Sequence, residues 1–442
     1  FVDHESPVGQ FFEAFDSLDS EVVLLNEDHK KTASQFGIHW NPRAKHPLVS
    51  ESIYASPEEA FVPLIETIAD SQFNLIVLYA EGLSARLVNG YDETFPNLTP
   101  NLKKFGDLSL SFDGYFNHTF ATYRGLHGQL CSVYPFFGGI GGWHTNYLNL
   151  KSVDYFCLPE LFHKRGYESV FLDTHQKDAA FIDEMMLELG FSSVLTSEDM
   201  QAKQYVGTPK RRDSMSDAQL YTSLIKWLQD RENSQTEPLF LGMYNLETHA
   251  WQRISDDGTP YPERDNYILD AVHNYDVQFG RFLEYFQSSK WFDNTVVIVT
   301  ADHAHYPDQD YRRLLLRDPD YVPVFVDEIP LMIYVPGLPG GLRFAVDDRT
   351  SVDFAPTVAQ LFSLDNVRNP FWGTSLLARY PEVGDRVGVA AGGDEMYLIQ
   401  EGRVLPEREY KQKNASPRLL LDFVRKSWEL ERLNLIWPSQ SD

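Results

Sequence analysis

Side chains capable of catalysis or metal binding directly follow four short apolar runs of the sequence. In chain order they are Glu81, then Asp173 with His175, then Glu247 with His249, and finally Asp302-His303-Ala304-His305. In an open α/β sheet, ligands bind in the crevice outside the carboxyl ends of the strands. A sheet built from these runs would therefore bring carboxylates and several imidazoles into one place.

Glu81, Asp302 and His303 are the predicted metal ligands of this group. Taken singly, a glutamate after a strand is often solvated, and an Asp-His pair is often a helix cap beside a surface histidine. Their convergence favours a metal site, because two carboxylates and one neutral imidazole form a largely oxygen-based set. Such a set suits Mn²⁺, our preferred ion, or Mg²⁺, with Zn²⁺ as a further alternative.

The segment Phe120–Leu130 contains a second group of reactive side chains. Leu126 and Leu130 are spaced as on one helix face, which places Thr122 and Arg124 at the N-terminus of a helix. Free N–H groups and the helix dipole favour an anion at such an end, and a guanidinium can hold two phosphate oxygens at once. Threonine is also a common N-cap, so the residue types alone leave that interpretation open.

Other polar residues are expected around the same site. His175 and Lys177 follow a strand end and are predicted to line a substrate pocket, as is His305, although exposed loop residues of these types are common. Trp143 and His144 lie in a glycine-rich segment, for which a plain surface loop is favoured over a mobile lid.

Strands that alternate with helices are predicted to position these residues. The runs 75–80, 169–172, 239–244 and 296–300 have strand length and follow turn signals. Apolar positions from Ile268 to Phe286 recur at spacings of four and three, which predicts a helix with one face on the sheet. The alternation predicts an α/β fold with a mainly parallel sheet.

Three parts of the chain differ in their pattern of apolar and polar residues. Residues 1–70 lack a sustained period and are predicted to wrap around the rest, and residues 71–380 carry the strand and helix pattern. Residues 381–442 are predicted to form a small C-terminal α+β part with a hairpin and a terminal helix. Within the second part, Thr99 is expected to cap a helix that begins at Pro100.

The composition excludes some classes of protein. With 442 residues and 43% hydrophobic content, the chain can bury a large core and is not a disordered protein. The formal net charge of −26, without a run of Lys and Arg, argues against nucleic acid as a partner. No apolar stretch approaches the length needed to span a bilayer, and an anchor upstream of Phe1 is left open.

The two cysteines, Cys131 and Cys157, are too few for a disulfide scaffold and lack the paired spacing of a structural zinc site. They would pair in an oxidising compartment or remain as two buried thiols. Our hypothesis is that they form a bridge, which would tether the loop after Thr122.

An ordered set of short motifs follows the strand that ends in Glu81. They are Thr99-Pro-Asn-Leu102, Thr122-Tyr-Arg-Gly125, Thr248-His249 and Thr300-Ala-Asp302-His303. The set resembles the alkaline phosphatase superfamily, and within it the lipoteichoic acid synthase and phosphoglycerol transferase family, often described as sulfatase-like. The similarity extends from about residue 73 to residue 377 and implies the alkaline-phosphatase-like version of the α/β fold.

The resemblance implies one divalent metal bound by Glu81, Thr122, Asp302 and His303, with His249 facing the substrate. It implies phosphodiester transfer or hydrolysis through a covalent phospho-threonine, outside the cytoplasm and with a membrane anchor in the full-length protein. A lipid-linked or glycan-linked phosphoglycerol is the leading substrate. The alternatives are phosphoethanolamine transfer, sulfatase-type ester hydrolysis, and a catalytically silent protein that binds a glycan or lipid headgroup.

Three positions differ from the patterns of related families. Sulfatases have Cys or Ser in a C/S-x-P-x-R context, whereas here Thr122 is followed by Tyr-Arg-Gly, which disfavours sulfate esters. Asn245 stands where two-metal phosphatases have an aspartate, which favours one metal. Phe181-Ile-Asp-Glu184 stands where lipoteichoic acid synthases carry a Trp and an Arg against glycerol phosphate, so the headgroup stays open.

Overall fold

A computed structural model shows a large, mostly parallel central sheet. It describes residues 24–36, 38–50, 56–135, 156–232, 234, 237–316, 318, 321–364, 368–379, 387–392, 395–410 and 416–437. The strands of this sheet are β1 (Asn74–Ala80), β2 (Leu110–Phe116), β3 (Glu168–Leu172), β4 (Ser193–Leu195), β5 (Leu239–Tyr244), β6 (Thr295–Ala301), β7 (Leu331–Tyr334) and β8 (Leu342–Thr350). Their order is β4-β3-β5-β1-β6-β7-β2-β8, and β7 alone among them runs antiparallel to its neighbours. The predicted α/β class is confirmed.

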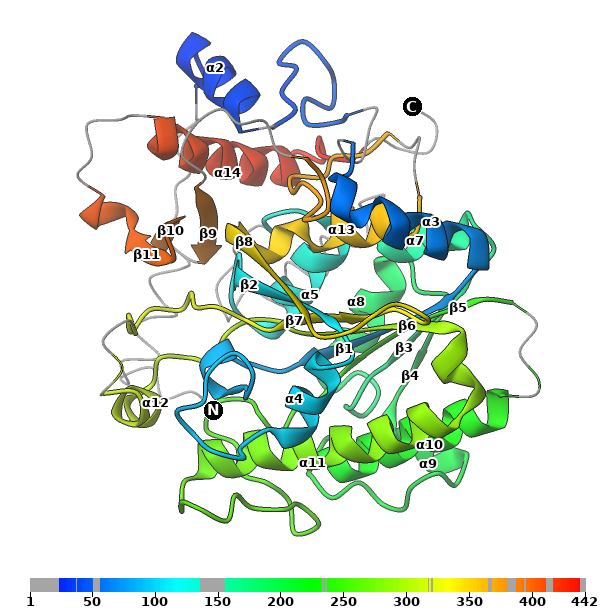
Figure 1. The fold of residues 1–442 in the computed structure, drawn as a ribbon. Coiled ribbons are helices and arrows are strands. Elements are labelled where there is room, and N and C mark those ends of the chain that lie inside the picture. The colour runs from blue at the N-terminus through cyan, green and yellow to red at the C-terminus, as the bar shows by residue number, and fades with distance from the viewer. Residues whose placement is uncertain are drawn as a thin grey trace.

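Helices cover both faces of this sheet (Figure 1). One face carries α4 (Pro100–Gly106), α10 (Asp217–Arg231) and α11 (Tyr267–Ser288), and the other carries α3 (Val62–Ser71), α5 (Thr122–Cys131), α7 (Leu158–His163) and α13 (Phe354–Leu361). The remaining helices are α2 (Glu27–Gln35), α8 (Ile182–Glu188), α9 (Ser197–Ala202), α12 (Gln309–Leu314) and α14 (Ser416–Arg432). The predicted apolar stripe of α11 is confirmed, since its members from Ile268 to Phe286 are buried.

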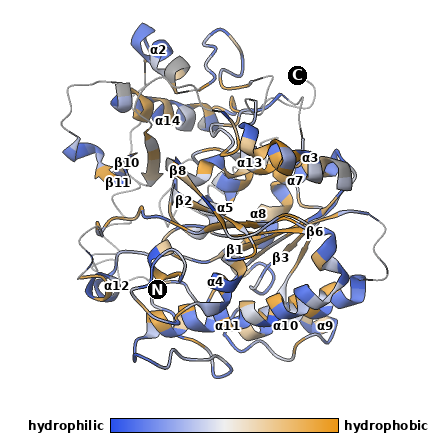
Figure 2. Ribbon diagram, in the orientation of Figure 1, coloured by the Kyte–Doolittle hydropathy of each residue, from blue (hydrophilic) through white to orange (hydrophobic). Residues whose placement is uncertain are grey.

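The core lies along the middle strands. Every residue of β1, β5 and β6 is buried, and Figure 2 shows β1 and β6 as hydrophobic ribbons between helices of mixed hydropathy. Parallel strands that are covered on both faces read as continuous apolar runs. This is why their positions could be predicted from the sequence, and why polar residues at their ends stand out.

The C-terminal part contains a three-stranded antiparallel sheet of β9 (Gly388–Gly392), β10 (Glu395–Gln400) and β11 (Arg403–Pro406). The predicted hairpin corresponds to β9 and β10, and the predicted terminal helix is α14. The strand β11 was missed because it has only four residues and ends in proline. Positive φ angles at Glu401 and Gly402 close the tight turn between β10 and β11.

The N-terminal part contacts the rest of the chain where it is described. Isolated bridges pair Ser50 with Asn369 and Pro57 with Ala378, and α2 packs against α14. The three-part division at residues 70 and 380 remains a prediction. In the described part of the chain, no helix has both the length and the apolar character needed to cross a bilayer.

The helix α4 begins at Pro100 with Thr99 at the N-cap position, as predicted, but the Thr99 side chain makes no capping hydrogen bond. The Thr99 hydroxyl accepts a hydrogen bond from the backbone N–H of Asn89 at 2.7 Å. The carboxylate of Asp276, on α11, instead accepts from the backbone N–H groups of Asn101 (3.1 Å) and Leu102 (2.7 Å). A carboxylate distant in sequence therefore accepts the hydrogen bonds from the first turn of α4 that the capping hydroxyl was expected to accept.

Cys131 and Cys157 form the hypothesised disulfide. It joins the end of α5 to the residue before α7, and both cysteines are fully buried. The bridge thus holds together two helices on the same face of the sheet. The segment with Trp143 and His144, for which a lid or a surface loop was considered, lies outside the described residues.

Candidate metal centre and active site

The ends of β1 and β6 bring the three predicted metal ligands together. These strands pair in parallel with Ala80 opposite Ala301, so the residues that follow leave the sheet side by side. Glu81, Asp302 and His303 are completely buried. One potential ligand atom from each lies within 4.8 Å of those of the other two. The structure therefore confirms the convergence that the strand ends predicted.

Three polar atoms of this cluster face one another without hydrogen-bond partners in the described part of the chain. They are Glu81 Oε1, Asp302 Oδ2 and His303 Nε2. The imidazole Nε2 lies 3.4 Å from Glu81 Oε1 and 3.6 Å from Asp302 Oδ2. Buried polar atoms are nearly always partnered, and a divalent cation would satisfy all three at once. The residues present therefore fit a bound metal.

Other atoms of the same side chains are fixed by hydrogen bonds. Asp302 Oδ1 accepts from the backbone N–H groups of Gly82 (2.8 Å) and His303 (2.7 Å). His303 Nδ1 lies 2.7 Å from the carbonyl oxygen of Ala304, which can only accept, so Nδ1 carries the proton. This contact leaves the Nε2 lone pair directed to the cluster, as a metal-binding histidine requires.

The titration of the cluster is strongly coupled. Burial and the charge of Glu81 raise the pKa of Asp302 to about 8. Burial alone would lower the pKa of His303, but the Asp302 and Glu81 carboxylates raise it to about 9. Burial opposes ionisation of Glu81, yet His249 and His303 lower its pKa to about 2. Without a cation the cluster therefore retains protons, which metal binding would release.

Thr122 reaches the cluster from the N-terminus of α5. Its hydroxyl donates a hydrogen bond of 2.7 Å to Glu81 Oε2. Gly125 permits this approach, because a Cβ at that position would lie 2.3 Å from the carbonyl oxygen of Asp302. Gln129 then donates to the same carbonyl at 3.0 Å. The glycine of the Thr-Tyr-Arg-Gly motif thus has a packing role that the sequence did not reveal.

His249 lies in the loop after β5 and is half-buried. Its Nδ1 lies 2.8 Å from the carbonyl oxygen of Ala250, so Nδ1 donates and Nε2 is the atom that can exchange a proton with a ligand. Its charge also contributes to the low pKa of Glu81. The structure therefore brings His249 into electrostatic contact with the cluster.

The other predicted substrate residues have different environments. Arg124 is buried and donates to the carbonyl of Phe120 at 3.3 Å and to the hydroxyl of Tyr123 at 2.6 Å. Lys177 is exposed. His305 is 3% exposed and stacks on Tyr311 at 4.4 Å.

The histidines His305 and His175 have different surroundings. For His305, burial lowers the pKa to about 4, so this imidazole is neutral near pH 7. His175 is partly buried beside Asp173, with Nδ1 3.2 Å from Asp173 Oδ1 and in contact with the hydroxyl of Tyr244. His175 is thus oriented by a carboxylate, whereas His305 is held by ring packing.

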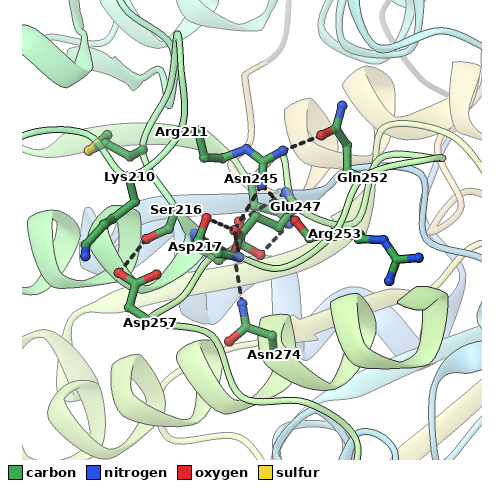
Figure 3. Close-up of polar contacts among 12 residues, drawn as sticks. Lys210, Arg211, Ser216, Asp217, Asn245, Glu247, Gln252, Arg253, Asp257 and Asn274 are labelled. Atoms are coloured by element: carbon green, nitrogen blue, oxygen red, sulfur yellow. Dashed lines mark hydrogen bonds and ion pairs between the residues drawn. The ribbon is translucent and has the colours of Figure 1, made fainter. Parts of the chain in front are cut away.

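A buried polar network behind Glu81 was not predicted from the sequence (Figure 3). Asn245 Oδ1 accepts from the Glu81 N–H at 2.9 Å, and Asn245 Nδ2 donates to Asp217 Oδ2 (2.9 Å) and Thr248 Oγ1 (3.0 Å). The Thr248 hydroxyl donates to the Glu81 carbonyl at 2.6 Å. Asn245 therefore fixes the backbone of Glu81, a predicted metal ligand, and forms hydrogen bonds through both the oxygen and the nitrogen of its amide.

Glu247 anchors the loop that follows β5. Its Oε1 accepts from the N–H (2.8 Å) and hydroxyl (2.5 Å) of Ser255 and from Arg211 (3.2 Å). Its Oε2 accepts from the N–H of Asp217 (3.1 Å) and from Asn274 (2.9 Å). Glu247 lies near the strand ends, as predicted. Its carboxylate, however, holds the loop after β5 and does not face the cluster of Glu81, Asp302 and His303.

Comparisons with known proteins identify the family and the fold of the chain. The family model described as Sulfatase matches residues 74–364. Phosphoglycerol transferase I of Citrobacter koseri and that of Escherichia coli are each 25% identical to this chain, over 57% of it and 34% of their own length. The chain therefore spans about a third of the length of these curated relatives.

Two solved structures share the fold. A protein of the alkaline phosphatase superfamily from Vibrio parahaemolyticus has a TM-score of 0.68 and 16% identity, covering 97% of this chain and 100% of its own. The lipoteichoic acid synthase LtaP from Listeria monocytogenes has a TM-score of 0.65 and 18% identity, covering 92% and 98%. With well over half of its residues matched by the family model, the chain belongs to the sulfatase family.

Proposed function

We propose that this protein transfers or hydrolyses a phosphodiester, with Thr122 as the nucleophile beside one divalent metal ion. The observation that carries the proposal is the 2.7 Å contact between the Thr122 hydroxyl and Glu81, at a cluster of three buried atoms that have no hydrogen-bond partner among the described residues. Phosphoglycerol is the leading transferred group, because the similar curated proteins are phosphoglycerol transferases. Mn²⁺ is the preferred ion, with Mg²⁺ or Zn²⁺ as alternatives.

The proposed residues divide the chemistry between them. A cation held by Glu81, Asp302, His303 and Thr122 would lower the pKa of the threonine hydroxyl and neutralise charge on the phosphoryl oxygens. Thr122 would react as the alkoxide, its hydroxyl proton having passed to solvent when the cation binds. Its Oγ then forms a bond to phosphorus while the bond from phosphorus to the leaving oxygen breaks. His249 donates a proton to that leaving oxygen.

The second half of the reaction releases the enzyme. An acceptor hydroxyl, or water, attacks phospho-Thr122, gives its proton to His249, and displaces the threonine oxygen. Arg124, His175, Lys177 and His305 are the proposed substrate-side residues. The low exposure of Arg124 and His305 means that they would act from the wall of the pocket, whereas Lys177 would act from its rim.

We propose an extracytoplasmic location for this activity, with a membrane anchor in the full-length protein. The disulfide between Cys131 and Cys157 supports an oxidising compartment. A catalytically silent binding protein is disfavoured, because all four proposed ligands are present and three converge in the structure. Sulfate ester hydrolysis is disfavoured by a threonine at the nucleophile position.

Two substitutions test the assigned roles with two kinds of phosphodiester. Thr122→Ala should abolish turnover and the covalent intermediate, whereas Thr122→Ser, which keeps a hydroxyl, should retain part of both. His249→Ala should slow an alkyl diester by roughly a hundredfold to ten-thousandfold. A nitrophenyl diester should be much less affected, because its leaving group needs little protonation.

The readouts are turnover of each diester and mass spectrometry of quenched enzyme. Normal turnover by Thr122→Ala would overturn the mechanism. Equal losses for both diesters in His249→Ala would reassign His249 from proton donor to substrate positioning.

A further inference from the structure

The residue before the proposed nucleophile has a strained backbone. Ala121 has a φ of 75° and a ψ of 133°, a combination that residues other than glycine rarely adopt. Its carbonyl accepts hydrogen bonds from the backbone N–H groups of Arg124 and Gly125, both at 3.0 Å, so this conformation starts the helix α5 and orients Thr122. Strained conformations persist only where the surrounding structure fixes them. The loop that leads to Ala121 must therefore be held by its neighbours.

Polar contacts hold the start of this loop, directly after β2. The side chain of Asn117 donates to the carbonyl of Phe325 at 2.9 Å and accepts from the backbone N–H of Asp327, also at 2.9 Å. The backbone N–H of His118 donates to Ser351 Oγ at 3.0 Å. The first two residues of the loop are therefore bonded to two different segments of the central domain.

The C-terminal sheet holds the end of the loop. The backbone N–H of Ala391, in β9, donates to the carbonyl of His118 at 2.8 Å. The ring of Phe120 lies against Gly392, where an added Cβ would be 1.7 Å from Cε1 of the ring and 2.3 Å from Cδ1 and Cζ. The same ring stacks on Phe325 with the centroids 4.4 Å apart. Phe120 can occupy this place only because residue 392 has no side chain.

The C-terminal sheet is itself packed on both faces. Ala390 and Tyr397 belong to one buried cluster with Phe116, the last residue of β2. Ala391 and Leu398 belong to another cluster, which includes buried residues of α14. Neighbouring residues of a strand point to opposite faces, so β9 is held between β2 and α14 (Figure 1). The position of β9 relative to the loop that follows β2 is therefore fixed.

We propose that Phe120, packed on Gly392, is a positioning residue for Thr122. The contact holds the residue before Ala121, Ala121 keeps its strained conformation, and the Thr122 hydroxyl meets Glu81 at 2.7 Å. The C-terminal sheet thus helps to build the active site without supplying a proposed ligand or proton donor. The nucleophilic role of Thr122 rests on the proposed function, whereas the position of its hydroxyl can be measured without turnover.

The test introduces a methyl group at this contact in the full chain. Gly392→Ala should push the Phe120 ring away and lower kcat for a nitrophenyl phosphodiester by about tenfold to a hundredfold, because a small misplacement of a reacting atom slows the reaction strongly. KM should change by less than about twofold, since the substrate-binding groups stay in place. Phe120→Leu should lower kcat less, by about threefold to tenfold, and the double variant should match it, because the shorter side chain leaves room for the methyl group. Gly207→Ala is the control, since an added Cβ there meets no atom within 4 Å.

Crystal structures of the same variants give a readout that needs no turnover. The distance from Thr122 Oγ to Glu81 Oε2 should lengthen in Gly392→Ala and return in the double variant. An unchanged distance, an unchanged kcat, or a loss that the double variant does not relieve would each overturn the inference. If Gly392→Ala does not fold, the kcat of Phe120→Leu and this distance decide in the same way. Absence of turnover in the unmodified protein would reject the phosphodiester function, and the distance alone would then decide the positioning.

Discussion

The substitution Glu247→Gln tests whether the buried network holds the site together. The carboxylate of Glu247 is fully buried and accepts hydrogen bonds at both oxygens, from Ser255 and Arg211 at one and from Asp217 and Asn274 at the other. Glutamine replaces one acceptor oxygen with an NH₂ donor. Whichever way the amide turns, this NH₂ faces groups that also donate, so at least two hydrogen bonds are lost.

The magnitude follows from these contacts. A hydrogen bond to a charged group contributes about 1.5–3 kcal/mol, and Arg211 would also lose its buried ionic partner. Part of the loss is offset because the negative charge of Glu247 repels Asp217. We therefore expect the free energy of unfolding to fall by about 3–5 kcal/mol. For a chain of this length that corresponds to a melting temperature lower by about 3–5 °C.

The loss of stability caused by Glu247→Gln should depend on pH. Burial, with the charge of Glu247, raises the pKa of Asp217 to about 8. A carboxyl group whose pKa is raised by folding favours the folded state at low pH, and this contribution is lost as pH rises from about 4 to about 8. Glu247→Gln removes the repulsion and brings the pKa of Asp217 closer to its unfolded value. The cost of the substitution should therefore be largest near pH 4 and smaller at pH 8.

The assay is a thermal melt of both proteins across this pH range. Glu284→Gln is the matched control, because it makes the same chemical change at an exposed position of α11 and should shift stability by less than about 0.5 kcal/mol. If Glu247→Gln melted within one degree of the unmodified protein at every pH, the network would not be stabilising and this reasoning would fail.

Two further predictions concern the metal and the disulfide. Elemental analysis should find about one divalent ion per chain. Added Mn²⁺ at a hundred times its dissociation constant should stabilise the protein by about 2.7 kcal/mol, and Glu81→Gln should remove this stabilisation. Two ions per chain, or a melting temperature that Mn²⁺ does not change, would contradict the one-metal prediction. Replacing Cys131 and Cys157 with serine should lower the free energy of unfolding by about 3.5 kcal/mol, because the bridge joins residues with a sequence separation of 26. Free thiols found by mass spectrometry in non-reduced peptides of fresh protein would refute the bridge.

The sequence predicted the features that depend on local pattern and strand direction. Fully buried strands such as β1 and β6 appear as apolar runs, and parallel pairing places their following residues together, which is why Glu81 and Asp302 could be matched. The contacts of Asp276 with α4 and of Asp217 with Asn245 could not be found this way. They join residues far apart in the chain, and an isolated aspartate has no periodic signature.

Asn245 shows how the network constrains the metal site. Its amide donates to Asp217 and Thr248 while accepting from the Glu81 backbone, and Thr248 already uses its hydroxyl hydrogen on the Glu81 carbonyl. An aspartate at position 245 would lose both hydrogen bonds that the amide donates and would place another carboxyl group against the buried Asp217. The resemblance implies an aspartate at this position in two-metal phosphatases, and the buried neighbours of Asn245 favour the asparagine. The same amide that fixes the backbone of Glu81, a proposed metal ligand, leaves no carboxylate at position 245 for a second ion.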